Sequence, residues 1–312
     1  MALIVELRAL LLARGFDCEL VAPERLRPLV QLFGGDRTVP PAPAPAVQQS
    51  LLEHVGAASA RSLTRAKEPL AFLGELVDAA VQTLRSPRRT NWRSLGPLIE
   101  RAGADAIAIV LLLDFLVGFV IALQAIPQLE MLGAGPYVAD LVGISVTREL
   151  VPLMTAIIIA GRSGAAYAAE LGTMHVSEEI DALETMGIAP VPYLVIPRVL
   201  ALAIVAPALV LLGDVAAVIG GLVVAVTSLD LTVQGYLTQL RLAVAPSDVY
   251  TGLIKGGVFA VAIAIIGCQE GLAARGAAAG VGRRTTATVV VSLFAVVVID
   301  TLLTILFRTV DL

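Results

Sequence analysis

Five long apolar stretches dominate the chain beyond residue 100. They are Ala104–Ile126, Val138–Ala169, Tyr193–Val226, Leu253–Gly267 and Thr288–Phe307. A helix needs about 20 apolar residues to cross the hydrocarbon core of a bilayer. The fourth stretch is short unless it extends back to Val249, and Pro197 and Pro207 predict a kink or break in the third. The pattern therefore predicts an all-α integral membrane protein with about five transmembrane helices.

The amino-terminal part of the chain has a different pattern. Residues 1–37 read as a short soluble segment of helix, strand and helix, and residues 38–50 form a Pro/Ala linker. Residues 51–101 carry amphipathic helices, and residues 102–312 form the transmembrane domain. One apolar stripe before the first span predicts a helix that lies in the membrane interface or covers a partner. It comprises Leu70, Leu73, Val77, Val81 and Leu84, with Phe72 and Leu76 beside it.

Composition agrees with lipid as the main solvent. Hydrophobic residues make up 57% of the 312 positions and charged residues only 15%, whereas soluble domains average about 25% charged. The net charge of −4 gives no reason to expect a nucleic-acid partner. The two cysteines and two histidines lack the spacing of a metal site, and no Walker A sequence is present. We therefore expect no catalytic site, no metal site and no cofactor in this chain.

Positive charges near the span ends predict the orientation in the membrane. The connection between the first two spans, Pro127–Val138, carries no Lys or Arg. Arginines instead gather before the first span and around the connections at residues 170–193 and 268–284. They are Arg85, Arg88, Arg89, Arg93, Arg101, Arg162, Arg198, Arg275, Arg283 and Arg284. The amino terminus and these two connections are therefore predicted to be cytoplasmic.

The connection after the second span contains a short amphipathic helix. Ser177 can cap a helix that starts at Glu178, and Gly187 can end it. Ile180, Leu183 and Met186 would form the apolar stripe, whereas Glu178, Glu179, Asp181 and Glu184 supply acidic side chains. Such a helix either docks in a groove of a soluble partner or forms a plain interfacial turn.

Charged residues inside apolar spans are costly and usually face the protein interior. Eight such residues lie in or beside the spans: Asp114, Arg148, Glu149, Arg162, Glu170, Arg198, Asp214 and Asp300. Neighbouring residues on a helix point about 100° apart, so Arg148 and Glu149 need not pair with each other. They form either a polar wall of a substrate cavity or an ion pair with another span, with Asp114 and Arg198 as partners. Asp300 either bonds to hydroxyl groups or pairs across a subunit contact.

Several polar motifs in the middle of the chain resemble the MlaE/YrbE family of ABC transporter permeases. They are Arg148-Glu149-Leu150-Val151-Pro152, Ala160-Gly161-Arg162-Ser163-Gly164, Ala169-Glu170-Leu171-Gly172-Thr173-Met174, Glu178-Glu179-Ile180-Asp181-Ala182-Leu183, Met186-Gly187 and Pro197-Arg198. The resemblance covers roughly residues 70–310. Residues 1–37 resemble only the tail of the STAS domain that longer members carry, so the start lies upstream or the domain has degenerated.

The resemblance implies a permease subunit that moves phospholipid or a related lipid between the bacterial inner membrane and an MCE-domain partner. It implies a homodimer, a separate cytoplasmic ATPase that binds ATP and Mg²⁺, and a STAS-domain protein as a further partner. Arg148 and Glu149 would fall near the lipid cavity, and the segment from Glu178 to Met186 would be the coupling helix. On the residues alone, an ion- or proton-coupled secondary transporter that uses Asp114, Glu149, Asp214 and Asp300 is the alternative.

Overall fold

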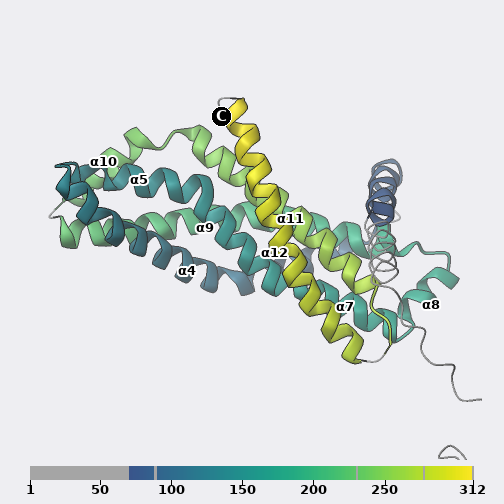
Figure 1. Cartoon of the computed structure of the whole chain (residues 1–312). Coiled ribbons are helices and arrows are strands. Elements are labelled where there is room, and N and C mark those ends of the chain that lie inside the picture. Colours follow the sequence, from purple (N-terminus) through teal and green to yellow (C-terminus); the bar gives the residue numbers. More distant parts are fainter. Residues whose placement is uncertain (1–69, 88–89, 230, 277, 311–312) are drawn as a thin grey trace, which may run out of the picture. The chain divides into compact units, whose positions relative to one another are not determined.

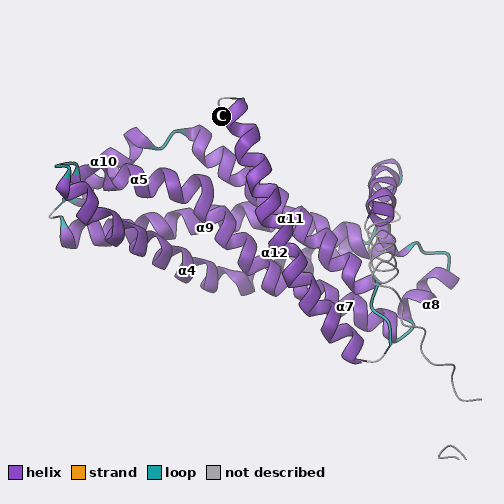
Figure 2. Cartoon of the chain, in the orientation of Figure 1, coloured by secondary structure: helices purple, strands orange, loops and turns teal. Residues whose placement is uncertain are grey.

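The computed structural model describes residues 70–87, 90–229, 231–276 and 278–310. They belong to one compact unit, Glu68–Leu312. The predictions for residues 1–37, 38–50 and 51–69 fall outside the described residues. Every regular element in the described part is a helix, and short loops join the helices (Figure 2).

Within the described residues, five helical segments are long and apolar enough to cross a membrane, as the sequence predicts. They run over Trp92–Met131, Gly135–Val176, Val191–Ser228, Pro246–Leu272 and Ala278–Thr309. The fourth is longer than its apolar stretch because Pro246 begins the helix, a position where its missing N–H costs nothing. The third continues through Pro207 instead of breaking there.

From Trp92 onwards the elements are η3 (Trp92–Ser94), α4 (Leu95–Met131), η4 (Gly135–Tyr137), α5 (Val138–Ser145), η5 (Val146–Leu150), α6 (Val151–Ile159), η6 (Ala160–Gly164), α7 (Ala165–Val176), α8 (Glu179–Thr185), η7 (Val191–Val195), α9 (Ile196–Ser228), α10 (Val233–Ala243), α11 (Pro246–Leu272) and α12 (Ala278–Thr309) (Figure 1). Helices α8 and α10 lie in the connections between spans. The labels η5, η6 and η7 mark π-helical turns inside the second and third spans.

The most extensive helix pairing joins α4 and α9. Their backbones come so close that a methyl group on Gly118 would overlap the carbonyl oxygen of Ala217. A methyl group on Gly220 would likewise overlap the carbonyl oxygen of Phe115. Glycines at such crossings are typical of membrane helices, which gain packing energy rather than hydrophobic energy from association.

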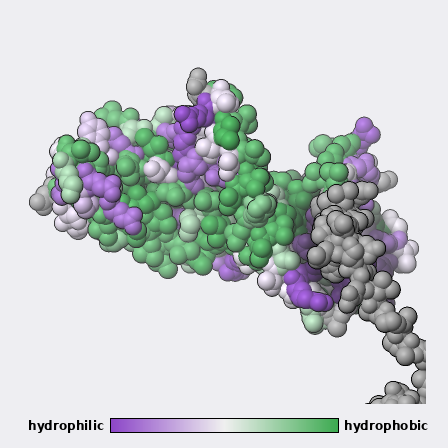
Figure 3. Space-filling view, viewed as in Figure 1, coloured by the Kyte–Doolittle hydropathy of each residue, from purple (hydrophilic) through white to green (hydrophobic). Residues whose placement is uncertain are grey.

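The lipid-facing character of the unit is visible on its surface. Hydrophobic residues cover its middle on the face that carries α4 and α12, and hydrophilic residues gather near α10 and the end of α12 (Figure 3). Leu112 on α4 and Phe294 on α12 are among the exposed apolar side chains. An exposed apolar surface of this kind marks contact with a membrane or a partner.

The helix over residues 70–85 turns a different face inward than the predicted stripe suggests. Phe72, Leu76 and Ala79 are buried and belong to a large apolar cluster of the unit. The stripe from Leu70 to Leu84 stays exposed. This helix therefore carries apolar side chains on two faces, and the exposed one is left for lipid or a partner.

Candidate functional site

The second span is interrupted where its two most unusual charges lie. Arg148 and Glu149 belong to the π turn η5, directly before Pro152. Proline cannot donate to the carbonyl of the residue four positions earlier, here Arg148, and its ring crowds that carbonyl. A local π turn is one way for a helix to absorb this defect, and such turns are frequent at functional sites.

Arg148 and Glu149 point to different partners on α11, so they do not pair with each other. The Arg148 guanidinium donates to Asp248 Oδ1 at 3.0 Å, and Lys255 Nζ donates to Glu149. The partners expected from the sequence are therefore wrong. Arg198 instead pairs with Glu170 at 3.0 Å, and the carboxylate of Asp114 has no hydrogen-bond partner among the described residues.

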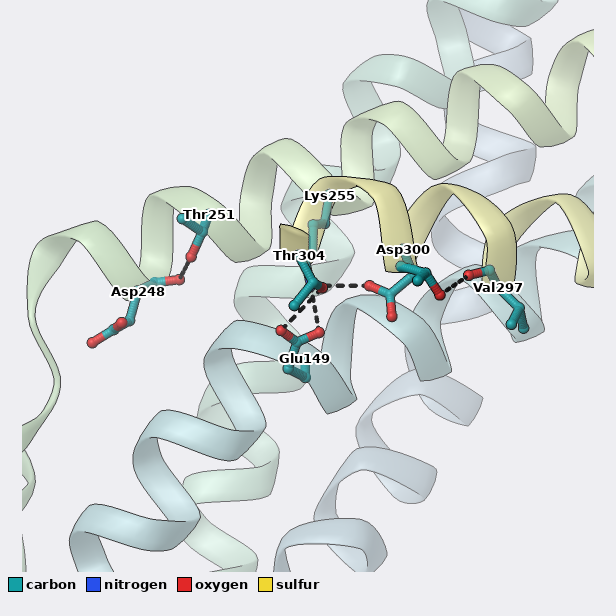
Figure 4. A network of polar contacts seen from close by, with 8 residues as sticks. Glu149, Asp248, Thr251, Lys255, Val297, Asp300 and Thr304 are labelled. Carbon is teal, nitrogen blue, oxygen red and sulfur yellow. Dashed lines mark hydrogen bonds and ion pairs between the residues drawn. The ribbon is translucent and has the colours of Figure 1, made fainter. Parts of the chain in front are cut away.

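Lys255 lies at the centre of the contacts around Glu149 (Figure 4). Its side chain is only 1% exposed, and it contacts residues from the second and fifth spans. Nζ donates to Thr304 Oγ1 at 2.8 Å and lies 3.0 Å from Asp300 Oδ1, while Thr304 Oγ1 donates to Glu149 Oε1 at 3.4 Å. Asp300 thus pairs within its own chain, contrary to both alternatives drawn from the sequence.

We call the set Arg148, Glu149, Asp248, Lys255, Asp300 and Thr304 the polar cluster. Buried charges are tolerated when they are paired, and this arrangement supplies a carboxylate for each cation. The Arg148, Glu149 and Asp300 side chains remain partly exposed. The cluster therefore presents partly exposed charges of both signs on membrane-spanning helices.

Sequence reasoning missed Asp248, Lys255 and Thr304. The available signal was the spacing of Asp248, Gly252 and Lys255, at i, i+4 and i+7, which puts them on one face of the fourth span. A polar stripe on a membrane helix faces protein rather than lipid.

A second group of charges ties three spans together near the other end of span two. Glu170 on α7 accepts from Arg198 on α9 and from Arg101 on α4. Arg162 pairs with Asp105 in the same region. These contacts make Arg162, Glu170 and Arg198 members of ion pairs between helices.

Asp114 and Asp214 are both buried, and none of their carboxylate oxygens has a hydrogen-bond partner among the described residues. A methyl group on Gly213 would overlap Asp114 Oδ2, so this carboxylate lies against the backbone of α9. Among the described residues, no group of three or more His, Cys, Asp or Glu side chains could hold a metal ion.

The predicted amphipathic helix is present as α8, but it starts differently. Ser177 lies outside its start, and its single hydroxyl proton can be donated either to Thr173 O at 3.0 Å or to Glu179 Oε1 at 2.9 Å. The helix boundary is instead Glu178, which adopts a left-handed backbone with φ of 61° and makes no side-chain capping bond. Serine capping is therefore wrong, because the chain reverses at Glu178, one residue later than predicted.

Gly187 ends α8 as predicted. Its φ is 76°, its N–H donates to Glu184 O, and the N–H of Ile188 donates to Leu183 O. This pair of bonds is a Schellman motif, which satisfies the last carbonyls of a helix. The bonds also fix the chain direction leading from α8 into the third span.

The apolar stripe of α8 is divided between two environments. Ile180 is buried, and Leu183 packs against the same apolar cluster of the chain. Met186 is 65% exposed, and Glu178, Glu179 and Asp181 are exposed as well. The surface that a partner can reach is therefore Met186 with the acidic side chains, and not the inward-facing Ile180.

Comparison with known proteins gives a consistent picture. The profile of the family described as Permease MlaE matches residues 97–306. A probable ABC transporter permease protein of Rickettsia felis is 42% identical over 205 residues, which is 66% of this chain and 79% of the relative. One from Synechocystis is 39% identical over 208 residues, 67% of this chain and 79% of the relative. The chloroplast protein TRIGALACTOSYLDIACYLGLYCEROL 1 of Arabidopsis thaliana is 32% identical over 219 residues, 70% of this chain and 63% of that protein.

Proposed function

Because this chain belongs to the MlaE family of ABC transporter permeases, we propose that it is the membrane-spanning subunit of a transporter for phospholipid or a related lipid. It is a multi-pass membrane protein, and its described residues include five helices long and apolar enough to cross a membrane. The name of the Arabidopsis relative contains a galactolipid, which supports a lipid as the cargo.

One structural observation carries the lipid part of this proposal. The partly exposed charges of Arg148, Glu149 and Asp300 lie on helices that are otherwise long and apolar enough to cross a membrane. A lipid has the same division, because its acyl chains favour apolar walls and its head group needs charged or hydrogen-bonding partners. In this proposal Arg148 and Glu149 form the polar wall of the lipid cavity, which a homodimer encloses.

The distribution of arginine supports an orientation in the bacterial inner membrane. Arginines are frequent within residues 85–101 and on both sides of the connection that contains α8, whereas Pro127–Val138 has no positive charge. The amino terminus and α8 are then cytoplasmic, and α10 lies outside. A lipid-binding MCE-domain protein would act on that outer side, and a STAS-domain protein would act in the cytoplasm.

Energy would come from a separate ATPase, as membership of an ABC transporter family implies. That partner would bind ATP and Mg²⁺, and this chain would hold no cofactor. The exposed surface of α8, formed by Met186 and the acidic side chains of Glu178, Glu179 and Asp181, is the proposed docking element. A partner groove recognises a docked helix through a few anchoring side chains.

We expect Met186→Arg to reduce co-purification of the ATPase at least about tenfold, since loss of a central interface anchor typically costs about 2 kcal/mol or more. Met186 is exposed, so the change should leave the fold intact. A charge at the inward-packed Leu183 would instead disturb both the fold of the permease and its docking to the ATPase. Leu242→Arg is the matched control, because Leu242 is 78% exposed on α10. The measurement is the amount of ATPase recovered after affinity purification of the permease. Equal recovery with the wild type, Met186→Arg and Leu242→Arg would rule out the docking role of α8.

The ion-coupled alternative is tested at Asp114. Asp114→Asn keeps the side-chain volume and removes a carboxylate that has no hydrogen-bond partner among the described residues, so ATP-driven lipid transfer should stay within about twofold of wild type. A carrier that moves ions or protons through Asp114 would lose transport in this variant. The measurement is lipid transfer by the reconstituted complex, with ATP and with an imposed proton gradient.

A further inference from the structure

One face of α11 packs against the π turn η5 through a series of residue contacts. Asp248 contacts Arg148, and Lys255 contacts Glu149. Between them lies Gly252, where a methyl group would overlap the carbonyl oxygen of Thr147. Three positions of α11 at i, i+4 and i+7 therefore contact three consecutive residues of the π turn. The missing side chain at Gly252 lets the two backbones approach, and the charges on either side fix the register.

Asp248 has two separate tasks in this contact. Its Oδ2 accepts from the backbone N–H of Ala245 at 2.9 Å, which caps the start of α11. Its Oδ1 accepts from the guanidinium of Arg148 at 3.0 Å. The Thr251 hydroxyl donates to the backbone carbonyl of Asp248 at 2.8 Å, and the side chain of Asp248 is nearly buried. One oxygen of the Asp248 carboxylate is thus held by its own helix, and the other holds Arg148.

We propose that Asp248 is a positioning residue of the lipid site: by joining the cap of α11 to Arg148, it fixes the guanidinium where the lipid head group meets the π turn. This inference rests on the proposed lipid role of Arg148. It assigns to Asp248 no contact with the lipid itself. Without Asp248, Arg148 keeps its charge but loses one of the contacts that orient it. Lipid recognition would weaken, while the ATP-driven step would be kept.

The capping task and the positioning task can be separated by two substitutions. Asp248→Asn retains one acceptor oxygen but loses the charged contact with Arg148. Ala245→Pro removes the capped N–H and leaves the Asp248–Arg148 pair in place. Ala245 has φ of −80° and ψ of 154°, and Val244 before it is extended, so proline fits this site without strain.

The test uses the permease assembled with its ATPase in phosphatidylcholine vesicles that contain increasing fractions of labelled phosphatidylglycerol. We expect Asp248→Asn to raise the half-saturating fraction about tenfold, the typical effect of losing a hydrogen bond to a charged group, with little change in maximal rate. Ala245→Pro should leave the half-saturating fraction unchanged. If Asp248→Asn fails to fold, Asp248→Ser replaces it, because a hydroxyl can still accept from Ala245 but carries no charge for Arg148.

Two results would overturn the inference, and Arg148→Ala tells them apart. If Arg148→Ala raises the half-saturating fraction but Asp248→Asn does not, or does so no more than Ala245→Pro, Asp248 is only a helix cap. If Arg148→Ala itself has no effect on lipid saturation, the lipid role of Arg148 fails and the positioning role fails with it. A shift in Asp248→Asn and Arg148→Ala, absent from Ala245→Pro, is the predicted outcome.

Discussion

Gly118→Ala is expected to destabilise the folded permease by about 3 kcal/mol, the upper part of the range for overpacked cores. The added methyl group would overlap the carbonyl oxygen of Ala217 in the backbone of α9. A backbone atom cannot change rotamer, so α4 and α9 would have to separate along their shared length. Because this is the most extensive helix contact of the unit, separation would also disturb the apolar packing on both sides.

Gly103→Ala is the matched control on the same helix. Its methyl group would meet Val205 Cγ1 at 3.6 Å and Val205 Cγ2 at 3.9 Å, which are ordinary van der Waals contacts. Thermal unfolding of the detergent-solubilised variants measures both effects, and Gly103→Ala should remain near wild type. If the two variants unfold at the same temperature, the close crossing of α4 and α9 is not a feature of the folded protein.

Lys255→Met is the second substitution with a large expected effect. Lys255 is buried and is contacted by Glu149, Asp300 and Thr304. Methionine preserves most of the apolar stem but leaves the two carboxylates facing each other without a cation. Removal of one partner from a buried ion pair typically costs about 3–5 kcal/mol. We therefore expect a large loss of thermal stability and of folded protein recovered from membranes.

The triple variant Lys255→Met, Glu149→Gln and Asp300→Asn tests the cause of that loss. Neutral amides remove the uncompensated charges, and replacing a buried ion pair by neutral groups is often close to neutral for stability. The triple variant should thus recover most of the stability while losing the charges at positions 149, 255 and 300. A triple variant as unstable as Lys255→Met alone would mean that packing, and not charge, holds Lys255 in place.

The spans could be predicted because their apolar character is a property of each segment alone. The five segments of the structure include all five apolar stretches, and Gly187 ends α8 as its sequence context suggests. Local turns were harder. Ser177 precedes acidic residues in the manner of a helix cap, yet the chain reverses at Glu178. The difference of one residue depends on how α7 ends, which no local pattern specifies.

Only the part of the candidate site on the second span was predicted from the sequence. Arg148 and Glu149 were recognised as unusual charges, but their partners lie about 100 positions away on another span. Pairing over that distance depends on which helix faces pack together, and hydropathy does not determine this. The polar stripe of Asp248, Gly252 and Lys255 contained the missing information, because only a protein-facing side of a membrane helix tolerates two charges.

ATP-driven lipid transfer by the purified complex tests the central claim most directly. The permease, its ATPase and an MCE-domain partner would be reconstituted in vesicles with labelled phospholipid, and transfer to the MCE-domain protein would be followed with and without ATP. The account predicts transfer that requires ATP and falls when Arg148 and Glu149 are both replaced by alanine. Transfer that is independent of ATP, or that is unchanged in the double variant, would contradict it.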